Sequence, residues 1–179
     1  EEIARLAGPV DKLFTQFSNA QGIGNPEDSE LRQRAADKKL KRIELQITAI
    51  KPKYVVPFAS FIWFSHIEND WHNDGTNTIH TAVNFINTKT ESTAICLYPE
   101  DEWDGLEPLS PVSALARYQD DYERIDTQER YSSPSIDIAT LKAQHTTFMA
   151  RLFEKNRPLV LHALYWSRRL QPTYVHVID

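Results

Sequence analysis

The stretch PKYVVPFASFIWFSHIENDWHND, residues 52–74, decides the fold of this chain and carries most of its candidate chemistry. Its first part is a β-branched and aromatic run, Tyr54-Val55-Val56, which predicts a buried strand over residues 54–58. Polar side chains interleaved with tryptophans follow that strand. Ligands of open α/β sheets bind beyond the carboxyl ends of the strands, so we expect this polar part to line a ligand site.

The segments on both sides of this stretch alternate between strand and helix. The pattern predicts a strand at 10–17, a helix at 27–50, the strand at 54–58, a helix at 77–88 and a strand at 93–97. The helix over 27–50 has apolar residues at three- and four-residue spacing, with the lysines and arginines on the opposite face. We expect Asn25 to cap it, and Thr76 or Asn77 to start the next helix. This order predicts an α/β fold with short crossovers.

The pattern changes after Trp103. LEPLSP at 106–111 is typical of a linker, and helices are predicted near 112–124 and 138–156, with a Ser/Pro break between them. Residues 159–179 contain LVLHALYW and YVHVID. We interpret these as two strands, although the first could equally be a short helix. The sequence therefore indicates a domain at 1–106 and an α+β extension at 107–179.

Composition excludes several classes of function. Only five glycines are present and no GxGxxG or Walker-type loop occurs, so a nucleotide-phosphate loop is not expected. The net charge is −5, and the one basic run, residues 38–42, is interpreted as the solvated face of a helix, so nucleic acid is not an expected partner. The single cysteine, Cys96, excludes an internal disulfide and is expected to be a buried structural thiol. No apolar run reaches a membrane span, and we expect a cytoplasmic protein that does not bind membranes.

The chain begins at Glu1, and its only methionine is Met149. We therefore expect a processed product, a trimmed chain or a fragment, in which case motifs upstream of Glu1 lie outside this sequence. The sequence does not determine the oligomeric state.

A dense polar cluster follows the strand at 54–58: His66, Glu68, Asn69, Asp70, His72, Asn73 and Asp74. These side chains offer enough nitrogen and oxygen donors for a divalent metal. However, the two histidines are six residues apart, which places them on different faces of a helix, and zinc sites usually use tighter pairs. Three interpretations stay open: a surface loop, a loop that contacts substrate, and direct metal ligation with His66 as the candidate ligand.

A second cluster, Glu100-Asp101-Glu102-Trp103-Asp104, comes directly after the predicted strand at 93–97. Two of these acids could act as an acid/base pair if buried, because mutual repulsion would raise the pKa of one of them. The alternative is a solvated turn. Asp101 and Trp103 join the substrate-pocket candidates, whereas His145, His162 and His176 are interpreted as ordinary core or surface histidines.

Several motifs, taken together, resemble the metallo-β-lactamase-fold hydrolases, in particular the branch that includes CMP-sialic acid hydroxylase-like proteins and their bacterial relatives. The motifs are QFSNAQGIGNPED, the long helix, KPKYVVPFASFIWFSHIEND, the NDGTNT helix start and LYPEDEWDG. The resemblance covers roughly residues 8–106 and implies the second half of an αββα sandwich. The extension at 107–179 has no counterpart to which we can assign a function.

The same resemblance implies a metal-dependent hydrolase. The family binds zinc or iron mainly through an HxHxDH motif, a further His and a bridging Asp, and these would lie before Glu1. Its last His ligand often follows a proline at the end of the strand that matches 54–58, where this chain has Pro57-Phe58-Ala59. His66 could supply a ligand instead.

The sequence therefore predicts the carboxyl-terminal portion of a metal-dependent hydrolase that acts on a small-molecule substrate together with the amino-terminal half of the same protein. In this hypothesis zinc or iron belongs to the full-length protein, hydrolysis proceeds by metal activation of water, and this portion alone is inactive. Its residues line the substrate pocket. The alternative is a non-catalytic ligand-binding or protein-interaction module.

Overall fold

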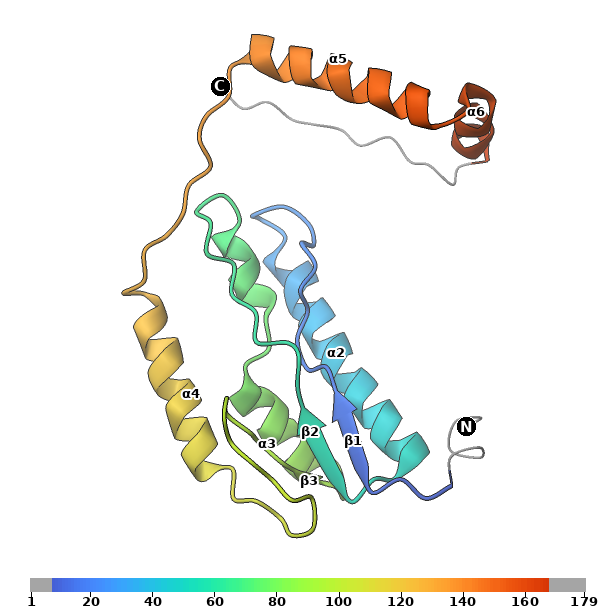
Figure 1. Cartoon of the computed structure of the whole chain (residues 1–179). Helices are drawn as coiled ribbons and strands as arrows, with labels where there is room; N and C mark the ends of the chain where they lie inside the picture. Colours follow the sequence, from blue (N-terminus) through green and yellow to red (C-terminus); the bar gives the residue numbers. More distant parts are fainter. Residues whose placement is uncertain (1–7, 168–179) are drawn as a thin grey trace. The chain divides into compact units, whose positions relative to one another are not determined.

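The computed structural model describes residues 8–167, and the chain divides into two compact units, Glu1–Ser133 and Pro134–Asp179. The first unit has an α/β fold, as the sequence predicts (Figure 1). Its elements are β1 (Lys12–Thr15), α2 (Ser29–Ile50), β2 (Tyr54–Pro57), the 3-10 helix η1 (Asp70–Gly75), α3 (Ile79–Lys89), β3 (Thr93–Ala94) and α4 (Val112–Ile125). The boundary between the two compact units lies after Ser133. The domain boundary predicted at residue 106 stays a prediction.

The three strands form one parallel sheet in the order β1-β2-β3. Lys12 pairs with Tyr54 at one end of β1, and Thr15 pairs with Pro57 at the other. β2 pairs with β3 over only two residues, Thr93 and Ala94. Helix α2 connects β1 to β2, and α3 precedes β3, so both crossovers return the chain to the same end of the sheet.

Helices α2 and α3 cover one face of the sheet and enclose the main core. Ala36, Leu40, Ile43 and Ile47 of α2 face inward, as their spacing predicts, and α4 adds Tyr118 to the core. The largest fully buried side chains are Phe17, Ile43, Ile79, Ile86, Ile95, Val55 and Cys96. Cys96 is buried, as predicted, and burial raises the pKa of its thiol to about 11.

The other face of the sheet is covered only in part. Tyr54, Val56 and Ile95 form a small second cluster there, under Trp103 from the loop after β3. Beside it, the rings of Phe14 and Phe58 pack edge to face with centroids 5.9 Å apart and remain 54% and 44% exposed. Parallel sheets are normally covered on both faces, so this exposed aromatic pair is unusual.

The helix ends refine the predicted boundaries. Asn25 does not cap α2, because its backbone N–H and its amide group both donate to the carboxylate of Asp28, the residue directly before the helix. At the other end Lys51 adopts a left-handed conformation ahead of Pro52, as expected for a helix stop. Helix α3 is capped by Thr78, whose hydroxyl accepts from the Thr81 N–H, and not by either of the predicted residues.

The second unit contains two helices, α5 (Ile138–Lys155) and α6 (Pro158–Trp166). LVLHALYW is therefore helical, which corrects the prediction of a strand; Pro158 starts it at a position where proline favours a helix. The expected strand YVHVID lies outside the described residues. No described residue of α5 or α6 is buried. Between residues 8 and 167, no helix is long and apolar enough to cross a membrane.

Candidate functional site

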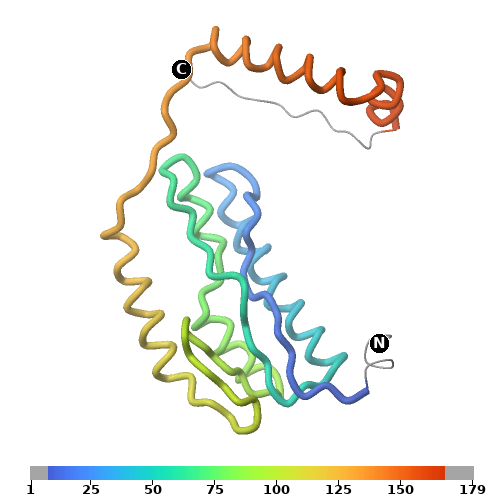
Figure 2. The backbone as a smooth tube through the Cα atoms, viewed as in Figure 1, coloured from blue at the N-terminus to red at the C-terminus, as the bar shows by residue number. Residues whose placement is uncertain are grey.

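The polar segment predicted to line a site runs from the carboxyl end of β2 back to α2. It begins at Ala59, which has a positive φ of 52° that is rare for a residue other than glycine. It ends in η1, which packs against α2. Near its end the segment lies beside the loop that follows β1 (Figure 2), since a Cβ added at Gly22 would lie 2.9 Å from the His72 ring.

Asp74 anchors the end of this segment through Arg32 of α2. The guanidinium donates from Nε to Oδ1 at 2.5 Å and from its second terminal nitrogen to Oδ2 at 2.7 Å. Arg32 is only 3% exposed, also donates to the carbonyls of Asn25 and Pro26, and lies over the Trp71 ring. The Arg32 hydrogen bonds lower the pKa of Asp74, and Asp74 raises the pKa of Arg32. Asp74 therefore holds the segment in place.

Asn73 closes the segment into a loop. Its amide oxygen accepts from the Phe64 N–H at 2.8 Å, and its amide nitrogen donates to the Phe64 carbonyl at 2.9 Å. The side chain thus replaces the partner that a neighbouring strand would give to Phe64. Because both of its polar atoms are engaged internally, Asn73 positions the loop.

His72 and Asn69 are the two predicted site residues that keep polar atoms without partners. Within the part of the chain that the structure describes, His72 Nδ1 and Asn69 Oδ1 are buried and accept or donate no hydrogen bond. The His72 ring lies between Trp71 and Phe64, with centroids 3.6 and 5.0 Å away. Burial lowers the pKa of His72, and the charge of Arg32 lowers it further. The imidazole is therefore neutral near pH 7.

His66 and Glu68 lie on a separate, exposed part of the segment. The Glu68 carboxylate accepts from the Ser133 N–H at 2.6 Å, and His66 pairs with Tyr131 in an isolated bridge. Backbone N–H donors, its own and that of Ser133, lower the pKa of Glu68. Because His66 Nδ1 is 3.9 Å from the Glu68 carboxylate, the two side chains are neighbours. Together they fasten residues 131–133 to the segment.

Asp101 and Trp103 do not join these residues. The Trp103 ring packs edge to face on Tyr54, the first residue of β2, and its indole N–H donates to the Glu107 carbonyl at 2.7 Å. Trp103 therefore lies at the amino end of β2, away from Ala59. Asp101 accepts from the Tyr98 N–H and from Arg117, and these bonds lower its pKa. The surroundings of Asp101 therefore lower its pKa, whereas a role as the acid of an acid/base pair would require a raised pKa.

The sequence did not predict two residues that hold the elements around this segment together. Arg32 was placed with the solvated basic residues, yet it is buried. The position of Arg32 along the helix could have indicated its burial, because it lies on the same face as the apolar residues Ala36, Leu40, Ile43 and Ile47. The second is Asn77, whose amide nitrogen donates to the carbonyls of Phe17 and Ala36 at 2.9 Å each. No local pattern in the sequence indicates that role.

Two of the three histidines interpreted as ordinary core or surface residues, His145 and His162, are exposed. His145 is exposed on α5, and His162 on α6 bonds the Pro158 carbonyl through Nδ1. His176 lies outside the described residues. In the described range 8–167, no group of three or more His, Cys, Asp or Glu side chains is placed to hold a metal ion. That His66 is a metal ligand stays a prediction.

Comparison with known proteins adds no constraint: no family model, no curated protein and no solved structure matches the chain.

Proposed function

We propose that this chain is the carboxyl-terminal portion of a metal-dependent hydrolase with the metallo-β-lactamase fold. In this proposal residues 58–75 form one wall of the substrate site. The observation that carries it is the exposed aromatic pair, Phe14 and Phe58, on a three-stranded parallel sheet whose other face is covered by α2 and α3.

A partly covered parallel sheet supports a sandwich with a second half. Sheets of globular domains usually have four to six strands, and this one has three within residues 8–167. No strand within residues 8–167 pairs with the outer edge of β1, and proteins usually cover such an edge. The other half of an αββα sandwich, supplied by the amino-terminal part of the same protein, would cover Phe14 and Phe58 and extend the sheet.

The anchored segment supports a role in binding substrate. Asn73 and Asp74 fix its backbone from two sides, and a rigid backbone is what a binding site needs. His72 and Asn69 then offer a neutral imidazole and an amide oxygen whose buried atoms have no partner among the described residues.

The residues of this chain do not fit a complete metal centre. The described part contains no three-ligand group, and Ala59 occupies the place of the histidine that the resemblance implies. The proposal therefore assigns the zinc or iron to the other half of the protein. This chain binds and orients the substrate.

A specific observation favours the alternative, a non-catalytic binding module. Three of the predicted pocket residues, Asn73, Asp74 and Asp101, use their polar atoms to hold the fold together. A binding module would need only the remaining groups. Metal dependence separates the two hypotheses.

Removal of metal from the natural protein that contains this sequence is expected to lower its thermal unfolding midpoint by roughly 5–10 °C, since a bound metal stabilises only the folded state. Differential scanning calorimetry before and after dialysis against chelator measures the shift, and added zinc or iron should restore the midpoint. An unchanged midpoint would favour the binding module.

A further inference from the structure

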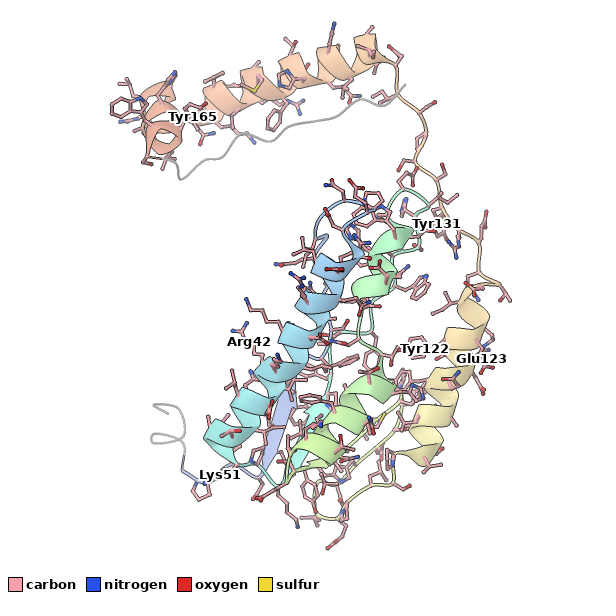
Figure 3. All side chains as sticks on the ribbon, turned by 180° about the vertical axis from the view of Figure 1, so that it is seen from behind. Arg42, Lys51, Tyr122, Glu123, Tyr131 and Tyr165 are labelled. Carbon is pink, nitrogen blue, oxygen red and sulfur yellow. The ribbon has the colours of Figure 1, made fainter. Side chains whose placement is uncertain are left out.

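A cleft of about 760 Å³ lies between α2 and the ends of β1 and β2; it shares Ala59, Ser60 and Ile62 with the start of the segment described above but none of residues 64–74. Its basic wall comes from α2, which contributes Lys38, Lys39, Lys41 and Arg42. Arg42 projects from the exposed side of the helix (Figure 3). The opposite wall comes from the segments that follow the two strands and includes Ser18 and Ser60, both of them buried.

The electrostatics of the cleft favour an anion. Among the described residues no Asp or Glu side chain lines it, although the whole chain carries a net charge of −5. The first unit has six described arginines. Five of them, Arg32, Arg34, Arg117, Arg124 and Arg130, form ion pairs, whereas Arg42 forms none within residues 8–167. A cation that the fold leaves without a carboxylate partner is available to a ligand.

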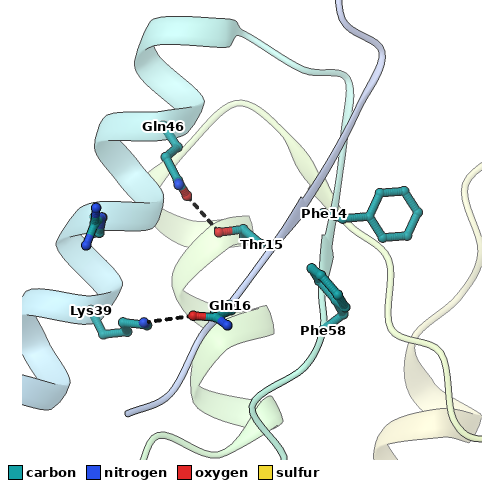
Figure 4. A pocket seen from close by; sticks show the side chains of 7 residues that line it. Phe14, Thr15, Gln16, Lys39, Gln46 and Phe58 are labelled. Carbon is teal, nitrogen blue, oxygen red and sulfur yellow. Dashed lines mark hydrogen bonds between the residues drawn. The ribbon is translucent and has the colours of Figure 1, made fainter. Parts of the chain in front are cut away.

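One of the cations, Lys39, is also held toward the sheet. Lys39 donates to the Gln16 side chain at 3.2 Å, and Thr15 donates to Gln46 at 2.7 Å (Figure 4). Lys39 and Arg42 line a second, smaller hollow of about 330 Å³ on the side of Phe14. These two residues therefore stand between the two hollows, where either could reach a ligand in the cleft.

The position of the cleft is the one that parallel sheets use for ligands. Its second wall is made from the residues directly after β1 and β2, beyond their carboxyl ends. Ala59, in that wall, is held at a φ of 52°, and such backbone outliers cluster at binding sites. Ser18 Oγ accepts from the Asn77 N–H at 2.8 Å, which leaves the hydroxyl hydrogen to donate to a ligand.

We propose that this cleft binds a small organic phosphate. A phosphate dianion matches several cations, including an arginine fork, better than a single carboxylate does. The volume suits a metabolite-sized molecule, and Ile23, Leu45 and Ile62 give its body an apolar surface. A nucleic-acid strand fits less well, because no aromatic side chain lines the cleft for base stacking. This inference does not depend on the proposed hydrolase.

Nuclear magnetic resonance titration of the ¹⁵N-labelled chain tests the proposal. The probes are inorganic phosphate, phenyl phosphate, benzyl alcohol as the uncharged control, and a single-stranded oligothymidylate. All titrations contain chelator, so that no metal mediates binding. Both phosphates should shift the backbone amides of residues 18, 38–42 and 60, phenyl phosphate should bind more tightly than inorganic phosphate, and benzyl alcohol should not bind.

Matched variants on α2 locate the binding. Arg42→Gln and Lys39→Gln should each weaken phenyl phosphate about tenfold, which corresponds to one charge-assisted hydrogen bond. Arg34→Gln removes the same charge from an exposed position of the helix outside the cleft and should change nothing. An equal effect of all three variants, or no shift with either phosphate, would overturn the proposal. Tighter binding of the oligothymidylate, with a steep salt dependence, would assign the surface to nucleic acid instead. Because these titrations exclude metal, either outcome leaves the hydrolase proposal to be judged by its own test.

Discussion

Replacement of Asn77 by aspartate is expected to lower the free energy of unfolding by about 3 kcal/mol. The Asn77 amide nitrogen holds the carbonyls of Phe17 and Ala36 and so joins the end of β1 to α2, while its own N–H donates to Ser18. Aspartate has the same shape but no donor, and it would place a carboxylate against two carbonyl oxygens. Urea unfolding followed by circular dichroism measures the change.

Asn84→Asp is the matched control. It makes the same chemical change on α3, at an exposed position, and should alter stability by less than about 0.5 kcal/mol. Equal losses in the two variants would show that the Asn77 bridge does not hold these elements together. A loss at Asn77 alone would support it.

Replacement of Gly75 by alanine is expected to cost about 2 kcal/mol. An added Cβ would lie 2.6 Å from the Arg32 Cβ and 3.3 Å from its backbone, so η1 and α2 would have to separate. That separation would also stretch the Arg32–Asp74 ion pair, which has bonds of 2.5 and 2.7 Å. Chemical denaturation gives the loss of stability, and amide shifts in η1 report the displacement.

Gly22→Ala is the control for close packing. Its added carbon would meet only the tip of the His72 ring at 2.9 Å, and the ring can shift more easily than the body of a helix. We expect a loss below about 1 kcal/mol. A larger loss at Gly22 than at Gly75 would contradict the account of how the segment is seated on α2.

The sequence predicts the α/β class because its signal is periodic and local. The inward spacing of Ile43 and Ile47 and the β-branched run at Val55 are enough to place α2 on one face of β2. It fails at LVLHALYW, because a short apolar run suits a helix and a strand equally well and the choice depends on the start at Pro158.

The candidate site was less predictable, because its geometry depends on contacts across long stretches of sequence. The sequence predicts that the polar segment follows the carboxyl end of β2, and the structure places it there. It cannot show that Asn73 turns back onto Phe64, or that Asp74 meets Arg32 forty-two residues away. Trp103 appeared to belong to the same site because it also follows a strand. The structure places it at the opposite end, against Tyr54.

The surroundings of the basic run of α2 also depend on residues that are distant in sequence. Its composition favours a solvated helix face, and Lys38, Lys41 and Arg42 are indeed exposed. The wall that converts this face into a cleft comes from Ser18 and Ser60, which are distant in sequence. Only the tertiary fold brings the two walls together.

The most direct test of the proposed function is the metal content of the natural protein that contains this sequence, purified without chelator and measured by inductively coupled plasma mass spectrometry. The account predicts about one or two zinc or iron ions per molecule, removed by chelator together with hydrolytic activity. Zinc and iron at the level of the buffer blank, with full stability and function in chelator, would contradict it.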